Sequence, residues 1–210
     1  MADEIEGSSL KAAQLFLRKG FEGILPELIA IVVAFLVGAI LLFVTGYSPS
    51  DAYNAMIQGA FGDIFGIGQT LTQATPMIFT GLSFLFASKC GLFNIGAEGQ
   101  LLVGGLTAAF VGISFHGLPI IIHVPLALLA GAVAGGLWGL IPAVLKAKLG
   151  AHEVITTMML SYVASYLTSY MVNYPLKAPG WVAQTVMVEP SAQLPSILQP
   201  TQLSASIFVA

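Results

Sequence analysis

The sequence has few charged residues, and this shortage excludes several classes of protein. Only 8% of its 210 residues are Asp, Glu, Lys or Arg, whereas soluble domains average about 25%. Together with 57% hydrophobic residues and a mean hydropathy of +0.90, this predicts an integral membrane protein. Seven Lys and Arg residues are too few for a surface that follows nucleic-acid phosphates, so no nucleic-acid partner is expected.

The sequence also has little that could support an enzyme. Its one cysteine, Cys90, excludes a disulfide within the chain and a zinc site built from cysteines. The zinc-protease pattern H-E-x-x-H begins at His152 but fails, because its last position holds Thr156. A Walker sequence for binding ATP is missing too. We therefore expect no catalytic residues, no metal and no cofactor on this chain.

Long apolar runs separated by turns predict an all-α fold, a polytopic transmembrane helical bundle. A bilayer requires roughly 20 apolar residues for each spanning helix. We expect about five complete spans and the start of a sixth, at residues 24–44, 69–88, 100–115, 120–145, 153–172 and from 204 onward. A glycine-rich loop is expected at 45–68. Residues 24–210 are then expected to be the N-terminal part of a longer transmembrane domain.

The N-terminal residues 1–23 are predicted to hold a helix that lies on the cytoplasmic membrane surface. Residues 8–22 put apolar side chains on one face and basic ones on the other. A frayed N-terminal arm is the alternative. With a cytoplasmic N-terminus every basic residue except Lys177 faces the cytoplasm, as the positive-inside rule requires.

The segment Gly91–Gly105 places an acid and two carboxamides between two apolar runs. A carboxylate at membrane depth is costly unless it faces water or a partner, so Glu98 is a candidate functional residue. Asn94 and Gln100 could bond the hydroxyls or ring nitrogens of a neutral solute. The alternative is that Asn94 and Glu98 bond backbone groups freed by a helix break. Glycines permit a broken or tightly packed helix here, and we expect structural roles for Gly91, Gly96 and Gly99.

The second predicted span carries a polar stripe at helical spacing, which includes Gln73 and Thr80. We interpret the stripe as the lining of a solute pathway, and the alternative is a helix–helix contact held by hydrogen bonds. The fourth span carries Gly131, Gly135 and Gly139 four residues apart, a spacing that predicts close helix packing. His123 is expected to be a hydrogen-bonded or an interfacial histidine and not a metal ligand.

Two motifs together resemble the permease subunits of bacterial ABC importers for nucleosides and simple sugars, in the group that includes ribose and branched-chain amino acid permeases. They are N-I-G-A-E-G-Q at 94–100 and G-A-H-E-V-I-T-T-M-M-L at 150–160, and the resemblance covers residues 25–175. It implies a multi-pass subunit of the bacterial plasma membrane that carries a nucleoside or simple sugar. It also implies an ABC ATPase subunit that binds ATP and Mg, a second permease subunit in a homo- or heterodimer, and an extracytoplasmic solute-binding protein. Membrane lipid surrounds the chain.

The second motif lies in a cytoplasmic turn that could dock into a groove on the ATPase. The candidate coupling residues are Gly150, His152, Glu153, Val154 and Thr157. The alternative is a charged turn without a partner. Two other functions stay open: a passive channel or facilitator with a glycine-rich re-entrant selectivity loop, and a structural membrane scaffold.

Overall fold

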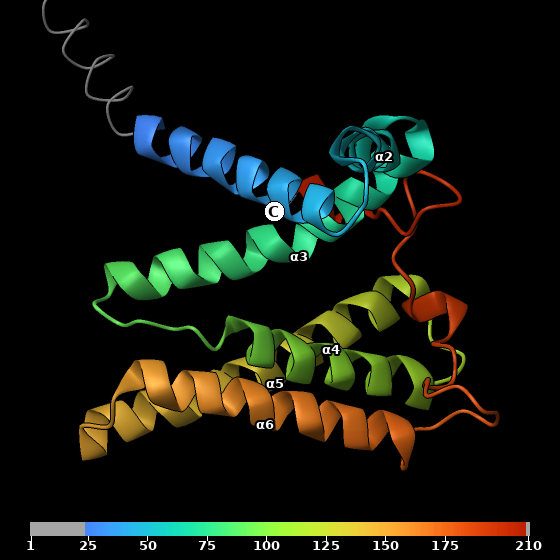
Figure 1. Ribbon diagram of the computed structural model, residues 1–210. Helices are drawn as coiled ribbons and strands as arrows, with labels where there is room; N and C mark the ends of the chain where they lie inside the picture. The colour runs from blue at the N-terminus through green and yellow to red at the C-terminus, as the bar shows by residue number, and fades with distance from the viewer. Residues whose placement is uncertain (1–23, 209–210) are drawn as a thin grey trace, which may run out of the picture. The chain divides into compact units, whose positions relative to one another are not determined.

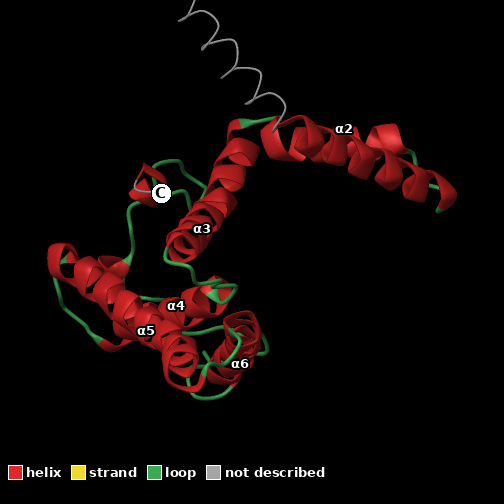
Figure 2. Ribbon diagram, turned by 90° about the vertical axis from the view of Figure 1, so that its left-hand side faces the viewer, coloured by secondary structure: helices red, strands yellow, loops and turns green. Residues whose placement is uncertain are grey.

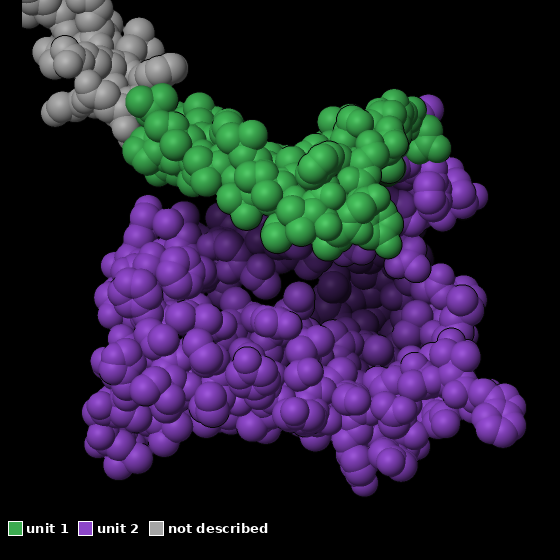
Figure 3. All heavy atoms as spheres, viewed as in Figure 1, with its two compact units in different colours: residues 1–63 green, residues 64–210 purple. Residues whose placement is uncertain are grey.

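The structure is a computed structural model that describes residues 24–208. The chain divides into two compact units, residues 1–63 and 64–210, which are coloured separately in Figure 3. The described residues form helices, turns and two isolated β-bridges, with no β-strand among them (Figure 2). The all-α fold class is therefore confirmed. The interfacial helix predicted for residues 1–23 lies outside the described residues.

The first unit has two described helices, Ile24–Val44 and α2 (Pro49–Phe61). α2 contradicts the loop predicted at 45–68, and its start signals are present in the sequence. The Ser48 hydroxyl accepts from the backbone N–H of Asp51, Pro49 occupies the first turn, and the Asp51 carboxylate favours the helix N-terminus. Tyr53 donates from its hydroxyl to the carbonyl oxygen of Phe35, which holds α2 against the first helix.

The second unit contains four long helices: α3 (Ile64–Lys89), α4 (Ala97–Ser114), α5 (Ile120–Leu149) and α6 (Glu153–Asn173). A loop follows with two short 3-10 helices, η1 (Pro190–Ala192) and η2 (Ala205–Phe208). In Figures 1 and 2, α4, α5 and α6 lie side by side. Three described helices, Ile24–Val44, α4 and α5, are long and apolar enough to cross a membrane. The chain is thus a multi-pass membrane protein.

α4 and α5 cross at two glycines, Gly104 and Gly131, so no side chain separates their backbones. A Cβ atom added to Gly104 would lie 2.9 Å from the carbonyl oxygen of Gly131, and one added to Gly131 would lie 2.9 Å from that of Gly104. A Cβ atom on Gly135 would meet the carbonyl oxygen of Gln100 at 2.9 Å. The two backbones are therefore in direct contact, as the four-residue spacing on α5 predicts.

His123, which is fully buried, holds the loop after α6 against the end of α4 and the start of α5. Its Nδ1 lies 2.8 Å from Ser191 Oγ, and its Nε2 lies 3.3 Å from the carbonyl oxygen of Val111. Since a carbonyl only accepts, Nε2 donates and Nδ1 accepts from the serine hydroxyl in the neutral ring. Of the two roles expected for His123, the structure shows the hydrogen-bonded one.

The crossing can be tested with two neighbouring glycines of α4. Gly104→Ala should lower the free energy of unfolding by about 1–3 kcal/mol, a typical cost of overpacking, because the new methyl group meets the Gly131 carbonyl. Gly105→Ala is the matched control, since a Cβ atom there has nothing within 4 Å. It should be neutral or stabilising by up to about 1 kcal/mol. Thermal unfolding in detergent, followed by circular dichroism, compares them, and equal Tm values would contradict the close crossing.

Candidate functional site

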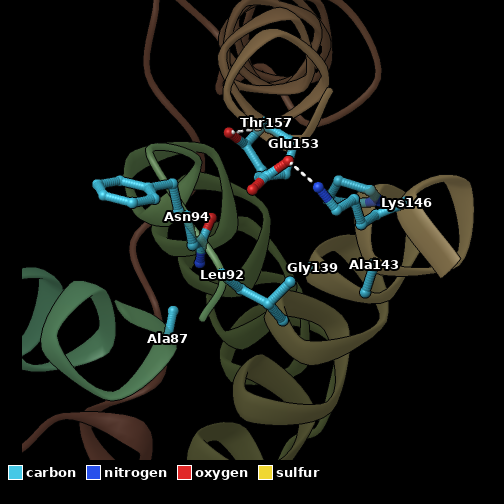
Figure 4. A pocket seen from close by; sticks show the side chains of 10 residues that line it. Ala87, Leu92, Asn94, Gly139, Ala143, Lys146, Glu153 and Thr157 are labelled. Atoms are coloured by element: carbon cyan, nitrogen blue, oxygen red, sulfur yellow. Dashed lines mark hydrogen bonds and ion pairs between the residues drawn. The ribbon is translucent and has the colours of Figure 1, made fainter. Parts of the chain in front are cut away.

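The two motifs recognised in the sequence meet at one cavity of about 120 Å³ in the second unit (Figure 4). The end of α3, the linker of residues 90–96, the end of α5 and the start of α6 all contribute to it. Most of the lining is apolar side chain or glycine backbone, from Ala87, Leu92, Phe93, Gly139, Pro142 and Ala143. The polar lining comes from Asn94, Lys146, Glu153 and Thr157.

The linker begins with a turn that requires Gly91. Its φ of +75° lies in the left-handed region, which residues with a Cβ atom rarely adopt. The N–H groups of Gly91 and Leu92 donate to the carbonyl oxygens of Ser88 and Ala87, both at 3.0 Å. This is the Schellman pattern that satisfies the last carbonyls of a helix. The role of Gly91 is therefore conformational, and a Cβ atom there would have open space.

Asn94 and Gln100 bind each other. Each carboxamide donates to the other over 3.3 Å, and Asn94 Oδ1 also accepts from the backbone N–H of Gly96 at 3.0 Å. The amide of Gln100 lies over Gly139 of α5, where a Cβ atom would meet Nε2 at 2.8 Å. Asn94 thus satisfies backbone at the start of α4, as the alternative interpretation expected.

Glu98 behaves differently from Asn94. It lies in the first turn of α4, its side chain is exposed, and it makes no hydrogen bond or ion pair with any residue in 24–208. Within residues 24–208 Glu98 thus bonds no freed backbone group, and its functional role stays a prediction. An acid in the first turn is favoured by the helix dipole, which accounts for the residue locally.

Gly96 and Gly99 let the start of α4 approach α6. A Cβ atom on Gly96 would lie 3.0 Å from Cβ of Thr157, and one on Gly99 would lie 2.7 Å from Cα of Ser161. On α6, Thr157 is buried and its hydroxyl donates to the carbonyl oxygen of Glu153 at 2.7 Å. The first turn of α6 is in this way fixed against the glycine segment.

The predicted coupling segment joins α5 to α6 through a tight turn. Gly150 ends α5 with a φ of +64° and donates to the carbonyl oxygen of Lys146 at 3.0 Å. His152 is the exposed N-cap residue of α6, and Val154 is half-buried. The Lys146 ammonium donates to Glu153 Oε2 at 2.6 Å and so ties the end of α5 to the start of α6.

This ion pair changes the acidity of Glu153, which precedes the apolar residues of α6. The hydrogen bond from Lys146 lowers the pKa of the carboxyl below its ordinary value, and the hydrogen bond from its own backbone N–H lowers it further. Because the pKa is lowered on folding, the pair stabilises the protein at neutral pH. That stabilisation is lost as the pH falls through the lowered pKa.

Two of the predicted pathway residues lie away from the cavity, on α3. Gln73 is exposed and lines a separate, open groove of about 440 Å³ with Gln69, Thr70, Ala74 and Met77. The Thr80 hydroxyl donates to the carbonyl oxygen of Pro76 within its own helix, at 3.0 Å. The structure therefore brings Asn94 together with Glu153 and Thr157, but it does not bring Gln73, Thr80 or Glu98 to them.

Lys146 belongs to this site, although the predicted coupling residues do not include it. Its partner, Glu153, lies seven residues later, across a turn. A glycine at position 150 between a basic and an acidic helix end is the signal that indicates such a pair.

The carboxamide pair can be tested by truncation. Asn94→Ala should lower the free energy of unfolding by about 1–3 kcal/mol, because the Gly96 N–H and the Gln100 amide lose their partners. Gln73→Ala is the control, since this carboxamide has no hydrogen bond to a described residue, and should change stability by less than about 0.5 kcal/mol. Thermal unfolding in detergent measures both. A loss in the control as large as that of Asn94→Ala would contradict the assigned contacts.

Comparison with known proteins places this arrangement in context. The profile of one protein family, described as the permease component of a branched-chain amino acid transport system, matches residues 66–209. The guanosine ABC transporter permease protein NupP of Bacillus subtilis is 50% identical over 144 residues, which are 69% of this chain and 41% of NupP. No solved structure matches the chain.

Two further relatives are similar over nearly the same length. The nucleoside ABC transporter permease protein NupB of Lactococcus lactis is 45% identical over 139 residues, 66% of this chain and 38% of NupB. The glucose ABC transporter permease protein TsgB13 of Haloferax volcanii is 40% identical over 134 residues, 64% of this chain and 35% of TsgB13. The chain thus matches between 35% and 41% of the length of these three relatives.

Proposed function

Because the chain belongs to the family of branched-chain amino acid transport system permease components, we propose that it is the membrane subunit of an ATP-driven ABC importer. The observation that carries the proposal is the family match over residues 66–209, which includes both motifs at the cavity. The names of the relatives support a nucleoside or a simple sugar as the solute. The chain supplies the path, and partner subunits bind ATP and Mg.

The proposed topology has five complete spans. It adds α3 and α6 to the three helices that are both long and apolar, since 26 and 21 residues suffice for a hydrocarbon core of roughly 30 Å. The distribution of basic residues supports a cytoplasmic N-terminus in a bacterial plasma membrane. The turn with Lys146 and Lys148 then lies in the cytoplasm, where an ATPase is accessible.

The polar face of α3 is the best candidate for the solute path. The carboxamides of Gln69 and Gln73 make no hydrogen bond with a described residue, and a carboxamide left without a partner in hydrocarbon costs several kcal/mol. We propose that Gln73 and Thr80 face water and solute. Glu98, which is exposed and unpaired within residues 24–208, belongs to the same group, and Asn94 and Gln100 would join it only if their mutual pair opens.

Coupling to ATP would run through residues 150–157. The Lys146–Glu153 pair joins α5 to α6, and α6 touches Gly96 and Gly99 of α4. A push on the turn would therefore move three helices as one body. The proposed partners are an ABC ATPase subunit at this turn, a second permease subunit, and an extracytoplasmic solute-binding protein.

Uptake into reconstituted vesicles tests the proposal. Vesicles that contain the full-length protein and its ATPase should accumulate radiolabelled nucleoside or sugar only when ATP and the solute-binding protein are supplied. Vesicles with ATP replaced by a non-hydrolysable analogue are the control. Equal flux without ATP would instead support the passive channel, and no flux for any solute would leave only a structural role.

A charge swap separates docking from internal pairing. Glu153→Lys alone places two ammonium groups together, so association with the ATPase and uptake should both fall. The double variant Lys146→Glu, Glu153→Lys re-forms an ion pair and should regain the Tm of the natural protein. If the Glu153 carboxylate itself contacts the ATPase, uptake should stay low, since a reversed charge in a docking groove costs several kcal/mol.

Lys148→Glu is the matched control, because Lys148 is exposed and has no ion pair with a described residue. It should leave Tm unchanged. Full recovery of uptake in the double variant would show that Glu153 acts only inside the permease.

A further inference from the structure

A short hairpin after α6 presents the most exposed large hydrophobic side chain of the described residues. Trp181 has a relative exposure of 102%, and it lies within residues 177–185, here called the Trp181 hairpin. A β-bridge between Lys177 and Thr185 and a hydrogen bond of 2.8 Å from Ala178 N–H to the Gln184 carbonyl oxygen close it. Figure 1 shows this part of the chain, in orange, extending beyond the end of α6.

The chain that follows the hairpin is held against α4 and α5. Glu189 N–H donates to the carbonyl oxygen of Gly112 on α4 at 2.9 Å, and Ser191 binds the buried His123. The hairpin is therefore attached to the helices on both sides, by α6 before it and by these contacts after it.

The hairpin has few charged side chains near it. Residues 178–188 include no charged side chain, and Val182 and Met187 in this stretch are exposed. The acid that follows, Glu189, already lies 3.1 Å from His116. Lys177 is exposed, and its ammonium has no ion pair with a described residue. The hairpin and the residues after it thus combine exposed apolar side chains with the Lys177 ammonium, which is unpaired within residues 24–208.

The position of the hairpin is set by the length of α6. Its 21 residues rise about 31 Å, close to the thickness of a hydrocarbon core. Since the Lys146–Glu153 pair lies at one end, Asn173 is at the opposite boundary. The exposed rings of Tyr170 and Tyr174 lie at that end, 5.1 Å apart. Tyr and Trp gather at this depth of a membrane, where one end of the ring is apolar and the other is wet.

We propose that the Trp181 hairpin is a lipid anchor in the leaflet at the Asn173 end of α6. The indole ring inserts at the boundary between headgroups and acyl chains, and its N–H donates to lipid ester or phosphate oxygens. The Lys177 ammonium binds a lipid phosphate, which supplies the anion that the protein does not. A docked extracytoplasmic protein is less favoured, because residues 178–188 carry no charged side chain and expose the apolar or aromatic side chains of Trp181, Val182 and Met187. The anchor does not depend on transport.

Tryptophan fluorescence tests the anchor, because the sequence has two Trp residues, Trp138 and Trp181. The chain is reconstituted into phosphatidylcholine vesicles that contain lipids brominated either near the headgroup or near the chain end. Subtracting the emission of Trp181→Phe from that of the natural chain isolates Trp181 and leaves the hydrogen bond from Trp138 to Leu160 intact. We expect a blue-shifted emission, stronger quenching by the shallow bromine than by the deep one, and weak quenching by iodide in the water.

Adding phosphatidylglycerol tests the part of Lys177. Iodide quenching of Trp181 should fall further in these vesicles, and this extra protection should be lost in Lys177→Gln. Water-like emission with strong iodide quenching would overturn the proposal and favour a protein partner for the hairpin. Stronger quenching by the deep bromine would overturn it as well, because the ring would then lie in the hydrocarbon core.

Discussion

The close approach of α4 to α5 and α6 is the contact on which the rest of the second unit depends. Between helices in lipid there is little hydrophobic driving force, so packing and hydrogen bonds must hold them together. Gly104 and Gly131 bring the backbones of α4 and α5 into contact, and Gly99 does the same for α4 and α6. Because the helices meet at these points, the ends of α5 and α6 converge on the linker at residues 90–96. The cavity lies at this convergence, and the pair of Lys146 with Glu153 forms one part of its lining.

This arrangement changes what the turn at residues 150–157 can offer a partner. Glu153 is engaged by Lys146 and largely covered, while His152 is exposed at the N-cap. An ATPase that docks here therefore meets His152 directly and reaches Glu153 only by adding to its ion pair or by breaking it. In the first case the pair transmits the push from the turn to both helices. In the second, the ion pair must break before the ATPase can bind Glu153.

The helices of the second unit follow from the sequence because apolar runs of spanning length have few alternatives. α2 does not, because the several glycines and polar residues of 45–68 predict a loop there, although Ser48 and Pro49 mark the start of a helix. Local spacing in the sequence identifies the motifs at the site, but it does not predict which of their side chains bind each other. Asn94 meets Gln100 across a helix start, and Lys146 meets Glu153 across a left-handed turn. Both contacts depend on backbone geometry that single-residue properties do not encode. Glu98 shows the converse: its cost at membrane depth suggested a partner, yet a first-turn acid can face outward.

The polar groups of the second unit fall into two kinds, and the difference bears on where solute would pass. Asn94 and Gln100 satisfy each other and the start of α4, so using them to bind solute first requires breaking two hydrogen bonds. Gln69 and Gln73 have no such bonds to described residues, and they share one open groove on α3. A closed pair of carboxamides stabilises a fold, whereas open carboxamides at membrane depth need water, a neighbouring subunit or a solute. The groove on α3 is therefore the better candidate for the solute path. The glycine segment is better explained as the contact that holds α4 against α5 and α6.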